Sequence, residues 1–339
     1  MSHADDLIFY VYSPPWVNWS AGIRVLHYLC DLMNKSGFES YLVLHGAKVK
    51  NSLSEDLITP VVDSVLLEKH KNSNKKIIVI YPESISGNPL NAMYVIRWVL
   101  NFPSLLAGPK NFQGEIVLAY SKVIAESLTQ KIQVPVLFIP ALKYEEILAF
   151  SNTIVRDKTE EFELLYAQKY RALGGTTQEL HRDFVEITRF GRKAPNRSET
   201  LDLIRNASIV HVYENTTVVT EALVLGTPVV CHRNQFFDRL IADNDLQMSG
   251  VSWDPNVIIS PDVNENMKIL RRAEEESSAT VSSIFSNLTL VPLTEEIGSG
   301  IVIPRRGKVT RHSIGRAKSV FVQKGPMVFL RFTWNYLFR

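Results

Sequence analysis

Short apolar runs alternate with segments of helical periodicity along the first 140 residues. We expect strands at the five runs LIFYVY, ESYLVL, KKIIVIYP, EIVLAYS and PVLFIP. The first helix is predicted to open at Ser20 and to stop at Gly37, because apolar residues such as Val25 and Leu29 recur between them at helical spacing. LNAMYVIRWVLN is predicted as a further helix, ended by Pro103. Near-continuous Val/Ile/Leu strands separated by helices predict a parallel sheet covered on both faces.

The alternation breaks at about residues 143–160, where the chain is charged and has no strand pattern. It resumes with FELLYAQ, VEITR, SIVHVYE, PVVCHR and GVSWD, and from about residue 263 the chain is again helical and charged. We therefore predict an α/β protein with two facing Rossmann-like domains. The expected domains are residues 1–150, residues 151–310 and a helical tail at 311–339.

The tail ends in PMVFLRFTWNYLFR, which mixes aromatic and basic residues. We favour a helix that crosses back and packs on the N-terminal domain. The alternative is an interfacial helix on an anionic membrane surface, and both can hold together. The run of 14 residues is too short to span a bilayer.

Composition narrows the possible functions. The 37 Lys and Arg against 35 Asp and Glu give a formal net charge of +2, which argues against a dedicated nucleic-acid binder. Cys30 and Cys231 cannot build a disulfide framework, so we expect a reducing compartment. The N-terminus has two acids and no basic region before its apolar run, so it is expected to be a buried strand and the protein cytoplasmic.

The most informative stretch is SIVHVYENTTVVTEALVLGTPVVCHR, residues 208–233. Its strand is expected to end at Glu214, Asn215 and Thr216 to form a polar turn, and a helix to begin near Thr217. The unpaired N–H groups and the dipole of that helix predict an anion site at the carboxyl edge of the sheet.

Glu221 is expected one turn into this helix, at the site edge, where a carboxylate can accept two hydrogen bonds from a ribose diol. The segment Glu-Ala-Leu-Val-Leu-Gly-Thr-Pro-Val-Val, residues 221–230, resembles the donor-site helix of GT-B glycosyltransferases, especially the retaining enzymes of family 4. The resemblance implies that Glu221 binds the ribose of a nucleotide-sugar donor. It also implies an acid near the donor sugar eight positions earlier; Glu214, seven positions earlier, is the candidate. The alternative is an ordinary helix–Gly–Pro–strand connection.

Family 4 enzymes also carry basic residues after the first strand of the C-terminal domain, where they neutralise the diphosphate. Here Lys169 and Arg171 follow FELLYAQ, although the usual Gly-Arg-x-x-x-x-Lys letters are absent. Both side chains can reach phosphate oxygens, and the alternative is solvated strand-end charge. A second basic cluster is expected to be a solvated loop, with nucleotide or acceptor contact as the alternative: Arg189, Arg192, Lys193 and Arg197.

In the N-terminal domain, Gly22 lies where GT-B enzymes commonly place a glycine-containing loop, so backbone can approach the donor phosphates or the acceptor there. The loop after KKIIVIYP contains Glu83 and Asn88, which resemble a polysaccharide-transferase loop and are expected to bind acceptor hydroxyls. The alternative is an Asn/Gly/Pro turn chosen for its backbone shape.

Several motifs are absent. The sequence has no G-x-G-x-x-G, no Walker loop, no G-x-S-x-G and no Cys/His zinc spacing. We therefore expect no metal or other cofactor, and no nucleic-acid partner.

The sequence predicts a glycosyltransferase that moves a sugar from a nucleotide-sugar donor to a hydroxyl of a glycan or lipid-linked glycan acceptor, in cell-surface polysaccharide synthesis and with retention. The alternatives are a catalytically silent GT-B partner subunit and a nucleotide-sugar 2-epimerase.

Overall fold

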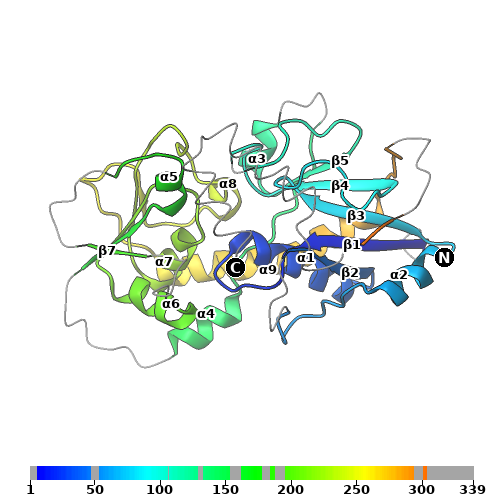
Figure 1. Cartoon of the computed structure of the whole chain (residues 1–339). Coiled ribbons are helices and arrows are strands. Elements are labelled where there is room, and N and C mark those ends of the chain that lie inside the picture. Colours follow the sequence, from blue (N-terminus) through cyan, green and yellow to red (C-terminus); the bar gives the residue numbers. More distant parts are fainter. Residues whose placement is uncertain are drawn as a thin grey trace. The chain divides into compact units, whose positions relative to one another are not determined.

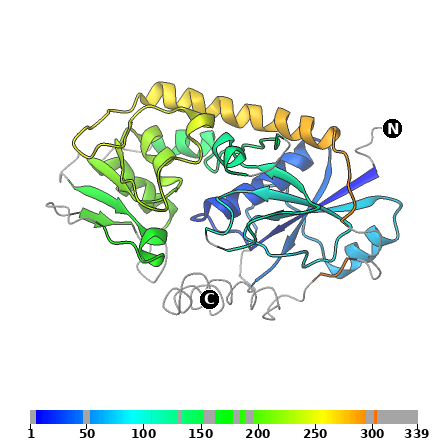
Figure 2. The same cartoon turned by 90° about the horizontal axis from the view of Figure 1, so that it is seen from above.

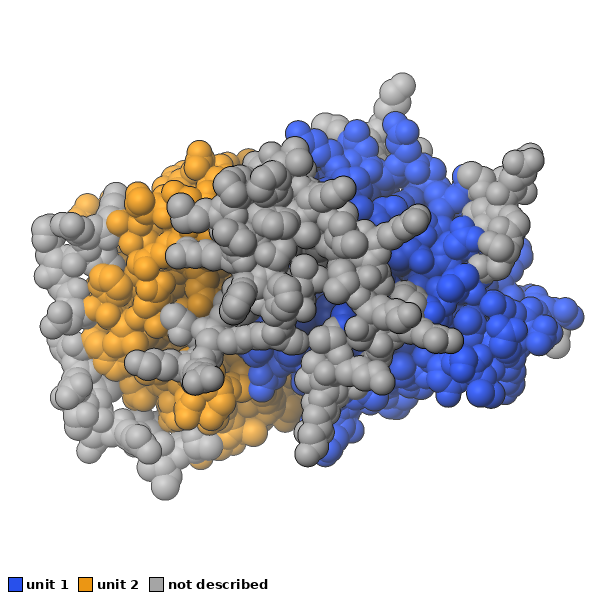
Figure 3. Space-filling view, viewed as in Figure 1, with its two compact units in different colours: residues 1–139, 276–339 blue, residues 140–275 orange. Residues whose placement is uncertain are grey.

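The computed structural model describes residues 6–46, 53–105, 107–128, 133–152, 162–177, 184–187, 195–293 and 301–303. The chain divides into two compact units, coloured separately in Figure 3. Unit 1 comprises residues 1–139 and 276–339, and unit 2 comprises residues 140–275. This division differs from the expected boundaries at residues 150 and 310.

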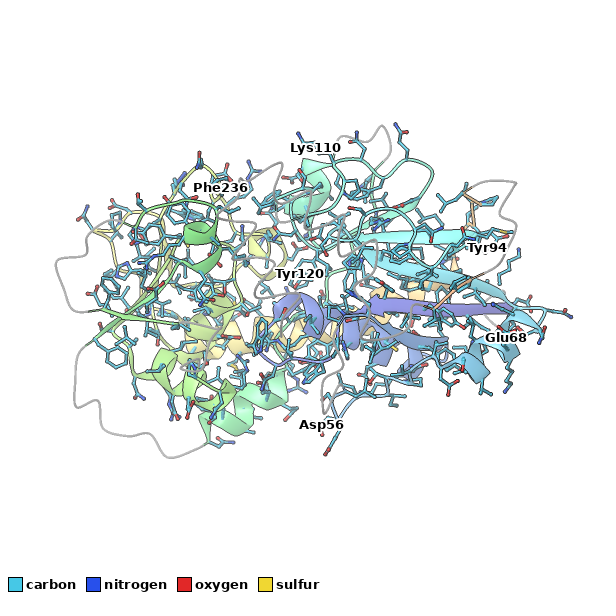
Figure 4. The ribbon with its side chains drawn as sticks, viewed as in Figure 1. Asp56, Glu68, Tyr94, Lys110, Tyr120 and Phe236 are labelled. Atoms are coloured by element: carbon cyan, nitrogen blue, oxygen red, sulfur yellow. The ribbon has the colours of Figure 1, made fainter. Side chains whose placement is uncertain are left out.

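Unit 1 holds a five-stranded parallel sheet in the order β2-β1-β3-β4-β5 (Figure 1). Its strands are β1 (Leu7–Ser13), β2 (Glu39–Leu44), β3 (Lys76–Pro82), β4 (Tyr94–Val99) and β5 (Ile116–Ala119). Its helices are α1 (Ala21–Lys35), α2 (Ser64–Lys71) and α3 (Lys122–Ser127). Every residue of β1 is buried, as expected for a central strand covered on both faces. Tyr94 lies at the amino edge of the sheet and Tyr120 at its carboxyl edge (Figure 4).

The predicted helix at LNAMYVIRWVLN is wrong, because Tyr94–Val99 form β4 between β3 and β5. Arg97 is a charged residue in the middle of this apolar segment, and its side chain is fully buried in the sheet. Its Nε and Nη2 each donate to the Glu115 carboxylate at 2.7 Å, and Nη1 donates to the carbonyl of Ile85 at 2.6 Å. PVLFIP also forms no strand; it contributes a single bridge between Ala119 and Val136.

Unit 2 holds a second five-stranded parallel sheet, in the order β10-β9-β8-β6-β7. Its strands are β6 (Glu163–Tyr166), β7 (Phe184–Glu186), β8 (Ile209–Val212), β9 (Val229–Cys231) and β10 (Val251–Ser252). Its helices are α4 (Tyr144–Ser151), α5 (Gln168–Ala172), α6 (Arg197–Asn206), α7 (Val218–Leu225) and α8 (Asp243–Leu246). The prediction of an α/β fold with two Rossmann-like parallel sheets is confirmed.

One sheet face of unit 2 packs on α7, through residues such as Val210, Val212, Val219 and Ala222. Gly226 ends α7 in the left-handed conformation, with φ +85°, as the sequence predicts. Helix α7 thus follows the carboxyl end of β8 after a short turn, and a second short turn leads from α7 into β9.

Helix α9 (Val263–Ser286) is a single 24-residue helix with residues in both units (Figure 2). Near its end, Phe285 is buried against Phe9 and Phe38 of unit 1, with ring centroids 5.2 and 6.1 Å away. The chain thus returns to the N-terminal unit through α9. The tail at 311–339, which was expected to do so, lies outside the described residues. Within the described part of the chain, the helices are too short or too polar to cross a membrane.

Candidate functional site

The carboxyl edge of the unit 2 sheet is the candidate site, because α5 and α7 both begin there after β6 and β8. Thr216 and Thr217 are half-buried at the start of α7, and the Thr216 hydroxyl accepts from the Val218 N–H at 3.3 Å. Asn215 fixes the loop after β9 to this turn: its Oδ1 accepts from the Ile241 N–H at 2.8 Å. The first turn of α7 is therefore rigidly placed and reachable from solvent.

Lys169 and Glu214, 45 positions apart in the sequence, meet beside this turn. The Lys169 ammonium donates to the backbone carbonyl of Asn215 at 2.8 Å and lies 3.7 Å from Glu214 Oε1. Glu214 Oε2 accepts from the backbone N–H of Tyr170 at 2.8 Å, and the residue is only 6% exposed. The structure thus brings together two of the three residues to which the sequence assigns catalysis.

Arg171, the third of these residues, is held toward β7 instead. It donates to Glu186 at 2.9 Å and to the Thr177 hydroxyl at 3.0 Å. Its charge is therefore already paired, whereas Lys169 lies at the turn before α7.

A stack of aromatic rings adjoins the Lys169–Glu214 pair. Tyr170 stacks on Tyr213 with centroids 5.4 Å apart, and Tyr213 stacks on His232 at 4.4 Å with nearly parallel rings. His232 hydrogen-bonds to His211, which in turn hydrogen-bonds to Glu163, each at 2.9 Å. Burial, with a smaller contribution from His211, lowers the pKa of His232 to about 4. This group was not predicted from the sequence, although His211 and Tyr213 share one strand face by their alternation.

Gly175 presses against the Tyr170 ring of this stack. A Cβ at Gly175 would lie 2.2 Å from the ring, so no larger residue fits without displacing Tyr170. Because the Tyr170 N–H binds Glu214, the glycine helps to place the Lys169–Glu214 pair.

Glu221 was expected at the site edge, and in the structure the residue has no exposed surface. Its Oε1 accepts from Arg197 Nη1 at 2.6 Å, and Arg197 Nε donates to Glu146 at 2.7 Å. Burial lowers the pKa of Arg197, but the two neighbouring carboxylates more than reverse this, and the net shift is upward. As the fourth residue of α7, Glu221 faces α6 and α4.

In unit 1, the side chains of Glu83 and Asn88 both have protein partners. Glu83 is 6% exposed and accepts from the N–H of Leu100, directly after β4, at 2.9 Å. Asn88 Oδ1 accepts from the Tyr81 hydroxyl at 3.0 Å and the Ala92 N–H at 2.9 Å. The Asn88 contacts fit the turn-forming alternative. Gly22 has open space where its Cβ would lie, so no group among the described residues requires glycine there.

Over the described residues, no three His, Cys, Asp or Glu side chains gather in a group that could hold a metal ion.

No protein-family model matches the chain, and no curated protein matches it. Similar solved structures include AviGT4, a glycosyltransferase involved in avilamycin A biosynthesis, at 15% identity over 83% of this chain and 99% of that chain (TM-score 0.45). The glycosyltransferase SnogD from Streptomyces nogalater is 10% identical over 82% and 97% (TM-score 0.37). Spinosyn rhamnosyltransferase SpnG, solved with spinosyn aglycone, is 11% identical over 81% and 96% (TM-score 0.35). Likenesses of this size do not establish an activity.

Proposed function

We propose that the chain is a glycosyltransferase that takes a sugar from a nucleotide-sugar donor and attaches it to a hydroxyl of a glycan acceptor. The observation that carries this proposal is the Lys169–Glu214 pair beside the first turn of α7. A fixed ammonium and a helix N-terminus at one sheet edge suit a diphosphate, and a carboxylate beside them suits the sugar attached to it.

The donor diphosphate would bind to Lys169, to the hydroxyls of Thr216 and Thr217 and to the first N–H groups of α7. Negative charge grows on the diphosphate as the glycosidic bond breaks, so a preorganised cation lowers the barrier more than it tightens ground-state binding. With this fixed charge the reaction needs no metal ion. Arg171 would contribute from further away, because it is bound to Glu186.

Glu214 would lie near the donor sugar, and retention of anomeric configuration is the stereochemistry that we propose. The Lys169 ammonium lies 3.7 Å from Glu214 Oε1, so it would hold the carboxylate next to the place where the donor sugar binds. We keep Glu221 as a residue of the ribose site. Because its carboxylate has no exposed surface, it would act on the nucleoside indirectly, through its ion pair with Arg197.

Glu83 and Asn88 remain proposals for the acceptor side, and Gly22 remains a proposal for the donor phosphates or the acceptor. The acceptor class that we propose is a glycan or lipid-linked glycan of cell-surface polysaccharide synthesis. The basic, aromatic tail would then add peripheral contact with the membrane surface where such acceptors lie.

The test is nucleotide release from a panel of UDP-, GDP-, ADP- and dTDP-sugars, measured with and without glycan acceptors. We expect release that depends on acceptor and is abolished by Glu214→Gln, with Glu275→Gln as the control. Glu275 is an exposed glutamate paired with Arg271 at 3.0 Å on α9.

Two other outcomes would contradict the proposal. Release without any acceptor would indicate the 2-epimerase. Nucleotide binding without release would indicate a catalytically silent partner subunit, a function that the seven-residue spacing of Glu214 and Glu221 favours as the second candidate.

A further inference from the structure

Arg197, the first residue of α6, is gripped by two carboxylates from two other helices. Glu146 of α4 accepts from its Nε at 2.7 Å, and Glu221 of α7 accepts from its Nη1 at 2.6 Å. The three side chains are 33%, 13% and 0% exposed for Glu146, Arg197 and Glu221, respectively. The guanidinium plane is therefore fixed from two sides.

The remaining nitrogen of this guanidinium, Nη2, has no hydrogen-bond partner among the described residues and is buried. A guanidinium carries five N–H donors, and both of those on Nη2 are unused here. Buried donors without acceptors are rare in folded proteins, and each calls for an explanation. A hydrogen-bond acceptor on a bound ligand is one such explanation.

The position of Arg197 suits a nucleotide. Helix α6 follows β7 and α7 follows β8, so both helices begin at the carboxyl edge of one parallel sheet, where Lys169 also lies. The charge of the cluster restricts which part of a nucleotide can bind there. Two carboxylates and one guanidinium sum to −1, which repels phosphate but accepts a neutral oxygen, such as a ribose hydroxyl or a base carbonyl.

We propose that Arg197 binds the nucleoside part of the donor through Nη2, and that Glu146 and Glu221 are the residues that position it. This assignment rests on the proposed nucleotide-sugar function. It gives the buried Glu221 a role at the donor site without direct contact with the ligand.

The experiment is calorimetric titration of the full chain with UDP, GDP, ADP, dTDP and, separately, inorganic pyrophosphate. Arg197→Lys keeps the positive charge and removes the planar fork. We expect it to weaken the tightest nucleoside diphosphate about tenfold and to leave pyrophosphate affinity within about twofold, because only the nucleoside contact is lost. Lys169→Ala should weaken both ligands.

Arg205→Lys is the matched control. Arg205 lies on the same helix and pairs with Asp202 at 2.7 Å, and its side chain is 11% exposed. The control should bind both ligands as the wild type does.

If Arg197→Lys binds nucleoside diphosphate like the control while Lys169→Ala is impaired, the inference is wrong and the proposed function stands. If the wild type binds none of the nucleotides, both are wrong. Should Arg197→Lys fail to fold, Glu146→Gln, at a partly exposed position, replaces it. We then expect several-fold weaker nucleoside diphosphate binding with pyrophosphate unchanged, and equal losses for both ligands would overturn the positioning role.

Discussion

Lys169 and Arg171 are two residues apart on α5, yet their charges serve different neighbours. Lys169 reaches the turn before α7, and Arg171 pairs with Glu186 on β7. We expect Lys169→Ala to lower turnover about a hundredfold, because a preorganised charge on the leaving diphosphate is lost. Arg171→Ala should change turnover less than about threefold, since its guanidinium is bound to Glu186 and Thr177 and not placed at the turn before α7. Steady-state rates at saturating acceptor check both, and equal losses would place Arg171 in the donor site.

Asn88 distinguishes acceptor binding from turn formation. Its side chain accepts from the Tyr81 hydroxyl and the Ala92 N–H and donates to the Ala92 carbonyl. We expect Asn88→Ala to lower the free energy of unfolding in urea by about 1–3 kcal/mol, because buried groups lose their partners. The control, Asn287→Ala, removes only an exposed bond to the Ser283 carbonyl. A raised KM for the acceptor with wild-type stability would support the acceptor role instead.

Part of the residue-level site follows from sequence. Strand ends of a parallel sheet meet at one edge, so Lys169 after β6 and Glu214 after β8 are predictable neighbours. The burial of Glu221 is not predictable, because it depends on Arg197 and Glu146, which lie on separate helices. Helical spacing gives the residues that share a face but not the helix that covers it.

At the scale of the element, the loop after α5 tests how the aromatic stack holds Glu214. Gly175→Ala places a methyl group in steric overlap with one edge of the Tyr170 ring. Because overpacking displaces neighbours, we expect a loss of about 1–3 kcal/mol in the free energy of unfolding and a fall in turnover.

The stability control for this change is Gly22→Ala on α1, where a Cβ meets no atom of the described part of the chain within 4 Å. Alanine in a helix should leave the free energy of unfolding unchanged or raise it by up to about 1 kcal/mol. A Gly175→Ala variant as stable as Gly22→Ala and as active as the wild type would show that the stack does not place the site.

Most strands were predictable because their apolar runs are nearly continuous, as in β1, β3 and β8. β4 was not, since Arg97 interrupts its apolar pattern and is neutralised by Glu115, 18 residues away. A sequence pattern contains the charge but not its distant partner. PVLFIP was predicted as a strand but forms only one bridge, because an apolar run can be buried without pairing along its length with a neighbouring strand.

At the scale of the whole molecule, two buried histidines tie stability to pH. Burial is the main reason that the pKa values of His27 and His232 fall from 6.5 to about 4 in the folded chain. The unfolded chain therefore binds more protons between these values, and stability is lost as the pH falls from about 6.5 toward 4. Each histidine should contribute roughly 1.4 kcal/mol per pH unit within that window.

Urea unfolding at a series of pH values measures this slope. His27→Gln and His232→Gln should each flatten it relative to the wild type, and the double variant should flatten it further. Slopes that do not change would mean that other titrating groups cause the acid sensitivity.

The path of α9 sets the order in which a ribosome completes the two units. Unit 2 is one continuous stretch that ends at residue 275, but unit 1 begins first and needs residues from 276 onward. At the usual 5–20 residues per second, roughly 7–27 s pass between the emergence of its first part and the arrival of the remainder. During that interval Phe9 and Phe38 lack the ring of Phe285 that covers them in the finished protein. We therefore expect this apolar surface of unit 1 to be most open to chaperone binding while unit 2 is being made.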